Sequence, residues 1–201
     1  MDWTDLDKVV DAFESRLNEW YIKPAEILQS QPDSGHLAFP VMALNCILLD
    51  TLSQFVKGPG KANFKLFVGE RMPEFQAIMP LQIEHRDPQT PNGVMLTTYA
   101  DALYHAFRCG ILHEAHVAAY GMVRGGTMLV EQIPAGFTSY FAGGDCPTVA
   151  IDPWRLLLKV KECVAWYIAS LKDRNAANDP LRQSFKTKFT ESFGVDITAA
   201  T

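Results

Sequence analysis

Residues 97–113 read TTYADALYHAFRCGILH and combine a clear helix start with the most chemically informative run in the chain. Thr97 or Thr98 is a suitable N-cap, because a threonine hydroxyl accepts a hydrogen bond from the first unpaired amides of a helix. The apolar residues that follow recur at helical spacing, namely Tyr99, Leu103, Ala106, Phe107 and Ile111. We therefore predict an amphipathic helix over residues 99–113.

Helical periodicity continues on both sides of this segment. An amphipathic pattern opens the chain near Leu6 and should end or kink at Pro24 before it resumes. The apolar run over residues 41–57, headed by Pro40, predicts the most buried helix. Asp152 followed by proline starts a long helix, and phenylalanines at every fourth position predict a last helix over residues 180–194.

Glycine and proline separate three short segments in the middle of the chain, residues 127–133, 137–142 and 148–151. We predict two or three short antiparallel strands there, as a β insertion over residues 127–151. Residues 84–93 are expected to form an irregular connection. The sequence thus predicts a mainly α fold, a helical bundle of about five to six helices with a small antiparallel β-hairpin or three-stranded insertion.

The composition favours one folded domain over residues 1–201, since 48% of residues are hydrophobic and 20% are charged. The formal net charge of -5 argues against non-specific coating of nucleic acid, and no DNA partner is predicted. The four cysteines form no C-x-x-C pair, and no signal segment is recognisable at Met1. The longest apolar stretch, residues 41–49, is far shorter than the roughly 20 residues of a membrane span. We therefore expect a cytoplasmic protein without a membrane partner.

Arg108 and His113 are the residues of the opening run that suggest chemistry. Five positions on a regular helix separate two side chains by about 140° and about 7.5 Å of rise, so the two would not share a face. A joint role then requires that the helix loosens near Gly110 or ends close to His113, that the arginine wraps round, or that a second copy supplies the missing partner. We favour the last of these, a two-fold site near a helix end.

An arginine and a histidine together suit phosphoryl transfer. The guanidinium holds a phosphate through two parallel hydrogen bonds and neutralises charge in the transition state, while the imidazole moves a proton. RNA supplies its own nucleophile, the 2′-hydroxyl beside the scissile phosphate. The expected reaction therefore needs no cofactor and no metal.

An arginine, four residues and a histidine near the end of a helix resemble the HEPN superfamily. The flanking segments, residues 49–52 in the second helix and residues 104–107 before Arg108, are similar as well, and the resemblance covers residues 1–172. Cys109 stands where the superfamily usually has a polar residue, often Asn. Ala115 replaces the tyrosine of the toxins that a nucleotidyltransferase silences, so that partner is not predicted.

The resemblance implies a metal-independent endoribonuclease, a toxin or phage-defence effector that acts as a homodimer. Arg108 would bind the scissile phosphate of an RNA substrate, and His113 would act as general acid or base. An antitoxin or defence-system protein would be a further partner. Asp50, His105, Cys109, Glu114 and His116 are the supporting site residues that we predict.

Other interpretations stay open. A non-catalytic HEPN-like dimer would serve as an interaction or sensing module. His105, His113 and His116 suggest a histidine-ligated metal hydrolase, whose third ligand would come from His36, His85 or Asp50. Cys109 beside an arginine is either an activated thiolate or a small buried residue. Four aromatic residues would either stack unpaired bases or pack the hairpin, namely Tyr120, Phe137, Tyr140 and Phe141.

Overall fold

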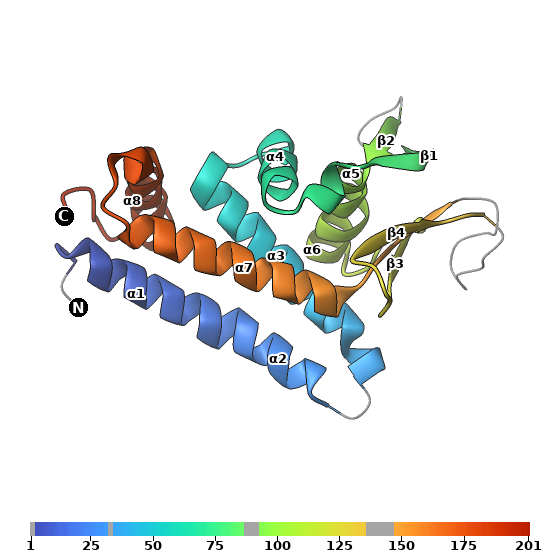
Figure 1. The fold of residues 1–201 in the computed structure, drawn as a ribbon, viewed down its shortest axis with the longest axis horizontal. Coiled ribbons are helices and arrows are strands. Elements are labelled where there is room, and N and C mark those ends of the chain that lie inside the picture. The colour runs from blue at the N-terminus through green and yellow to red at the C-terminus, as the bar shows by residue number, and fades with distance from the viewer. Residues whose placement is uncertain (1–2, 32–33, 87–92, 136–146) are drawn as a thin grey trace.

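Helices make up most of the protein (Figure 1). The computed structural model describes residues 3–31, 34–86, 93–135 and 147–201. Within these ranges the chain forms six continuous helical rods and two small β-sheets. The predicted mainly α fold is confirmed.

The first rod consists of α1 (Leu6–Leu17), a π-helical turn η1 (Asn18–Ile22) and α2 (Lys23–Gln29). Asp5 caps it, because its carboxylate accepts hydrogen bonds from the backbone amides of Asp7 and Lys8. Pro24 lies in the first turn of α2, directly after the wide turn. The rod therefore widens before the proline instead of ending there.

The core is built around α3 (Ala38–Lys57), which packs against α7 (Pro153–Lys172), α4 (Lys61–Arg71) and α8 (Asp179–Phe193). Its apolar residues Met42, Leu49 and Leu52 are fully buried. Within the described ranges, Gly35–Lys57 is the one helix long and apolar enough to cross a membrane, and half of its apolar window is buried. The sequence analysis underestimated the length of this apolar helix, because it counted only the uninterrupted apolar run over residues 41–49. The buried residues of this helix belong to the core of the chain.

The phenylalanines of α8 pack inside the same chain. The Phe185 ring lies 5.4 Å from that of Phe13 in α1 and 5.9 Å from that of Phe55 in α3, between ring centroids. Phe189 continues the cluster. Figure 1 shows α8 at the end of the bundle where both termini lie.

The two sheets differ from the predicted insertion. β1 (Ile78–His85) pairs antiparallel with β2 (Val94–Thr98), where the sequence showed only prolines and an irregular loop. β3 (Gly121–Val123), β5 (Thr148–Ile151) and β4 (Val130–Ile133) form a mixed sheet in that order.

Two of the predicted strands are confirmed, because β4 lies within residues 127–133, β5 covers residues 148–151, and the two pair antiparallel. The third strand departs from the prediction, because β3 runs parallel to β5 and precedes residues 127–151. A three-residue strand has too little periodicity to be recognised. The predicted strand over residues 137–142 lies outside the described residues, as do Phe137, Tyr140 and Phe141.

Candidate active site

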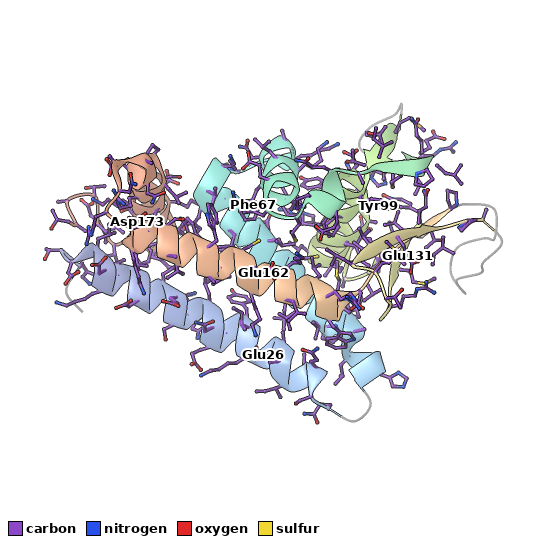
Figure 2. All side chains as sticks on the ribbon, viewed as in Figure 1. Glu26, Phe67, Tyr99, Glu131, Glu162 and Asp173 are labelled. Atoms are coloured by element: carbon purple, nitrogen blue, oxygen red, sulfur yellow. The ribbon has the colours of Figure 1, made fainter. Side chains whose placement is uncertain are left out.

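The helix that carries Arg108 and His113 starts with a capping box. Thr98 is the N-cap of α5 (Tyr99–Ala102), and its side chain and that of Asp101 exchange hydrogen bonds with each other's backbone amides. Lys65 from α4 also binds Asp101, at 2.6 Å from Nζ to Oδ1. The Tyr99 side chain lies beside Glu131 and Gln132 of β4 (Figure 2). The capping box and the ion pair of Asp101 with Lys65 thus fix the start of the helix.

The helix then widens into the π-helix η4 (Leu103–Cys109) and tightens again into α6 (Gly110–Glu114). A π-turn hydrogen-bonds residues five apart, and such turns occur frequently at functional sites. Arg108 Nη1 lies 3.0 Å from His113 Nε2, within one chain. The two side chains therefore meet within one chain, which the favoured two-fold arrangement did not require. Arg108 lies at the end of η4 and His113 in the regular helix α6, and the contact is made by the terminal Nη1 of the long arginine side chain.

Asp50 in α3 holds the other edge of the guanidinium. Arg108 Nε and Nη2 each lie 3.0 Å from Asp50 Oδ1. Gln54, one turn further along α3, donates to Asp50 Oδ2 at 2.9 Å. Although burial acts to lower the pKa of Arg108, the hydrogen bond with Asp50 raises it above its ordinary value. The arginine therefore stays charged, and Asp50 leaves Nη1 directed toward His113.

Cys109 and Tyr104 line the same side of the site. The Cys109 sulfur lies 3.9 Å from Arg108 Nη1, and the thiol is half-buried. Arg108 Cζ lies 5.4 Å from the centre of the Tyr104 ring. Burial raises the pKa of Tyr104, and its contact with Cys109 adds to this, so the phenol keeps its proton. Behind them, burial raises the pKa of the Cys46 thiol.

His105 belongs to a neighbouring cluster and does not contact His113. Its ring centroid lies 4.6 Å from that of His85 in β1. Burial lowers the pKa of His105 to about 4, and the cations of Lys61 and Lys65 act in the same direction. The imidazole is therefore neutral near pH 7.

Glu114 and His116 are exposed at the end of α6 and pair with each other, at 3.3 Å between Glu114 Oε2 and His116 Nε2. The helix ends because Ala115 takes a left-handed conformation at φ 56°. His105, His113 and His116 thus have three different environments. Among the described residues, no three His, Cys, Asp or Glu side chains are placed to hold one metal ion.

Sequence reasoning missed Gln54 and Tyr104 as members of these clusters and named His85 only as a possible metal ligand. Gln54 was recognisable, since it follows Asp50 by four residues on one helix. Tyr104 and Cys109 are five residues apart, a spacing that only the π-turn makes close. His85 reaches the helix through strand pairing, for which the sequence gives no signal.

The Arg108–His113 geometry can bind an anion and move a proton. Nη1 can only donate, so Nε2 accepts and the imidazole proton lies on Nδ1 in this arrangement. His113 is exposed, so an anion can reach its ring from solvent, and its Nδ1–H can donate to a phosphate oxygen. Comparison with known proteins adds no relative: no family model, curated protein or solved structure matches this chain.

Proposed function

We propose that the protein is a metal-independent endoribonuclease in which Arg108 and His113 act on the scissile phosphate of RNA. The observation that carries this proposal is the 3.0 Å contact between Arg108 Nη1 and His113 Nε2. Asp50 supports it, because the carboxylate orients the guanidinium without occupying Nη1. The resemblance of the Arg-x4-His run to the HEPN superfamily agrees with this chemistry.

In the proposed reaction the 2′-oxygen attacks phosphorus and the bond from phosphorus to the 5′-oxygen breaks. Arg108 donates hydrogen bonds to the non-bridging oxygens, whose negative charge grows in the transition state. His113 transfers a proton, either from the 2′-hydroxyl or to the leaving 5′-oxygen. The products are a 2′,3′-cyclic phosphate and a 5′-hydroxyl.

The proposal includes a homodimer in the cytoplasm that acts as a toxin or defence effector. Two copies across a two-fold axis would supply two His113 side chains, one for each proton transfer. Exposure of His113 is compatible with this arrangement. Joining two copies of Arg108 would also concentrate positive charge in a chain of net charge -5.

A non-catalytic dimeric module is the second candidate. The observation that favours it is the ion pair of Arg108 with Asp50, whose side chains are both only 17% exposed. A guanidinium that is already paired can serve packing alone. Activity measurements separate the two functions.

The test is expression of the wild type, His113→Ala and His116→Ala, followed by growth and by the integrity of cellular RNA. His116→Ala is the matched control, since His116 is an exposed histidine three residues away whose side chain, among the described residues, pairs with Glu114 alone. We expect RNA cleavage by the wild type and the control, and none by His113→Ala. Purified protein should cleave equally in EDTA. Toxicity that survives His113→Ala would refute the nuclease, and loss in EDTA would indicate a metal-dependent hydrolase.

A further inference from the structure

A groove with aromatic walls lies between the first rod and α8, and Arg108 and His113 are not part of it. Its volume is about 330 Å³. Five aromatic side chains line it, namely Trp3, Phe13, Trp20, Phe189 and Phe193. Figure 1 shows α8 beside the start of α1 at one end of the bundle, while α6, which carries His113, lies toward the other end. This aromatic groove is therefore separate from the candidate active site.

The aromatic groove has a fixed floor and an exposed rim. Phe13 and Phe189 are buried in the floor, with their ring centroids 6.4 Å apart. At the rim, Trp20 is 58% exposed and Trp3 is 37% exposed. Indole rings bury a large apolar area when a ligand covers them. The rim therefore offers apolar contact area on a floor that the core holds in place.

Arg16 supplies a positive charge to this groove, and two aromatic rings hold its side chain. Its Cζ lies 4.1 Å from the centre of the Trp20 ring and 5.0 Å from that of the Phe193 ring. Both distances are within the range of cation–π attraction. Within the described ranges of the chain, the Arg16 side chain forms neither an ion pair nor a hydrogen bond. Its N–H groups are therefore left for a ligand.

The carboxylates of the first rod that lie closest in sequence to Arg16 have other partners. Glu19, which also lines the groove, pairs with Lys23. Lys172 of α7 binds two further carboxylates of α1, those of Asp11 and Glu14. None of these acids neutralises Arg16, although the chain as a whole has a net charge of -5.

The charge and shape of the groove select the class of ligand. A guanidinium binds a planar carboxylate through two parallel hydrogen bonds. One arginine matches one negative charge, and the net charge of -5 disfavours a dianion such as a phosphate monoester. The aromatic rim requires an apolar body beside that charge. Small-molecule sites occupy roughly 300–1,000 Å³, so a volume of about 330 Å³ suits a small ligand.

We propose that the aromatic groove binds a small monocarboxylic acid with an apolar body. The carboxylate pairs with the guanidinium of Arg16, and the apolar body lies against the rings of Trp3 and Trp20. This site needs no residue of the proposed ribonuclease, so it stands or falls independently of RNA cleavage.

The test compares octanoate, 1-octanol and octylammonium, which share one alkyl chain and differ in charge. Their dissociation constants are measured by isothermal titration calorimetry on the full chain, well below the concentrations at which they form micelles. We expect octanoate to bind about three- to tenfold more tightly than octanol, and octylammonium to bind more weakly than octanol, because Arg16 attracts the anion and repels the cation.

Two variants separate the charge from the apolar surface, and both replace exposed residues, so the core stays intact. Arg16→Met keeps an unbranched apolar side chain and removes the charge. It should abolish the preference for octanoate over octanol and change the dissociation constant of octanol by less than about twofold. Trp20→Ala should weaken octanoate and octanol alike, by about five- to tenfold.

Arg86→Met is the matched control, because Arg86 is an exposed arginine after β1 that pairs with Glu84. It should leave all three dissociation constants unchanged. Equal binding of octanoate and octanol by the wild type, or a preference that survives Arg16→Met, would overturn the proposal. So would a failure of octanoate to bind at millimolar concentration. An amphipathic helical peptide with glutamate side chains that binds where octanoate does not would instead assign the groove to a protein partner.

Discussion

Replacing Gly110 with alanine should destabilise the protein, although the same change in most helices is stabilising. Gly110 has ordinary helical angles, φ -57° and ψ -48°, so helix propensity alone predicts a gain of about 1 kcal/mol. A Cβ at this position would lie 2.5 Å from the backbone carbonyl oxygen of His116. Real contacts are never that close, so the backbone after α6 must move.

That backbone is held at two points. The His116 amide donates to the Gly110 carbonyl at 3.2 Å, and the Ala118 amide donates to the Ala106 carbonyl at 3.0 Å. Overpacking against a fixed neighbour costs about 1–3 kcal/mol, which outweighs the propensity gain. We expect a net loss of about 1–2 kcal/mol in the free energy of unfolding. Because His113 lies in α6, between Gly110 and the displaced backbone at His116, cleavage should fall about 10- to 100-fold.

The assay is urea denaturation of Gly110→Ala beside Gly69→Ala. Gly69 is also a buried helical glycine, but its added Cβ would meet only the side chain of Gln76, at 2.8 Å, which can rotate away. The control should therefore change stability by less than about 1 kcal/mol. If Gly110→Ala is as stable as the wild type, with an unchanged m-value, the close approach of residues 110 and 116 is refuted.

Three further predictions concern the charges around this helix. Asp50→Asn should lower the free energy of unfolding by about 1–2 kcal/mol and reduce cleavage at least tenfold, because Arg108 loses its charged partner. An unchanged rate of RNA cleavage would refute a role for Asp50 in orienting Arg108. His105 has a pKa of about 4, below its ordinary value, so the unfolded chain takes up this proton first as the pH falls. Stability should decrease by about 3 kcal/mol between pH 6.5 and 4 in the wild type and by less in His105→Gln, measured by denaturation at both pH values. Burial acts to raise the pKa of Asp101, but hydrogen bonds from Lys65, Thr97 and Thr98 lower it below its ordinary value. Asp101→Ala should therefore lower the free energy of unfolding by about 2 kcal/mol at pH 7 and by less below pH 3, in the same denaturation assay.

The helices were predictable because each has a local signal. The capping box at Thr98, the proline after Asp152 and the phenylalanines of α8 all lie within a few residues of what they determine. The strands were less predictable, since β1 contains Pro80 and β3 has only three residues. Their pairing depends on contacts far apart in the chain, which residue patterns do not encode.

The candidate site was likewise predictable only in part. Arg108, His113 and Asp50 were identified from residue type and spacing, and the structure brings all three together. The favoured two-fold arrangement did not anticipate the contact of Arg108 with His113 within one chain, which the long arginine side chain makes at its terminal Nη1. His85 and His105 were considered together only as possible metal ligands and Tyr120 only as a stacking residue; the contacts among the three were not predicted, since they come from three separate elements.

Chemical analysis of the cleaved RNA ends tests the central claim most directly. With purified protein in EDTA and a defined RNA, we predict fragments that end in a 2′,3′-cyclic phosphate and begin with a 5′-hydroxyl. Cleavage should stop when the nucleotide before the cut is made 2′-deoxy, and should be absent in Arg108→Ala and His113→Ala. Fragments that end in a 3′-hydroxyl, or cutting at the 2′-deoxy position, would contradict a reaction in which Arg108 and His113 promote attack by the 2′-hydroxyl.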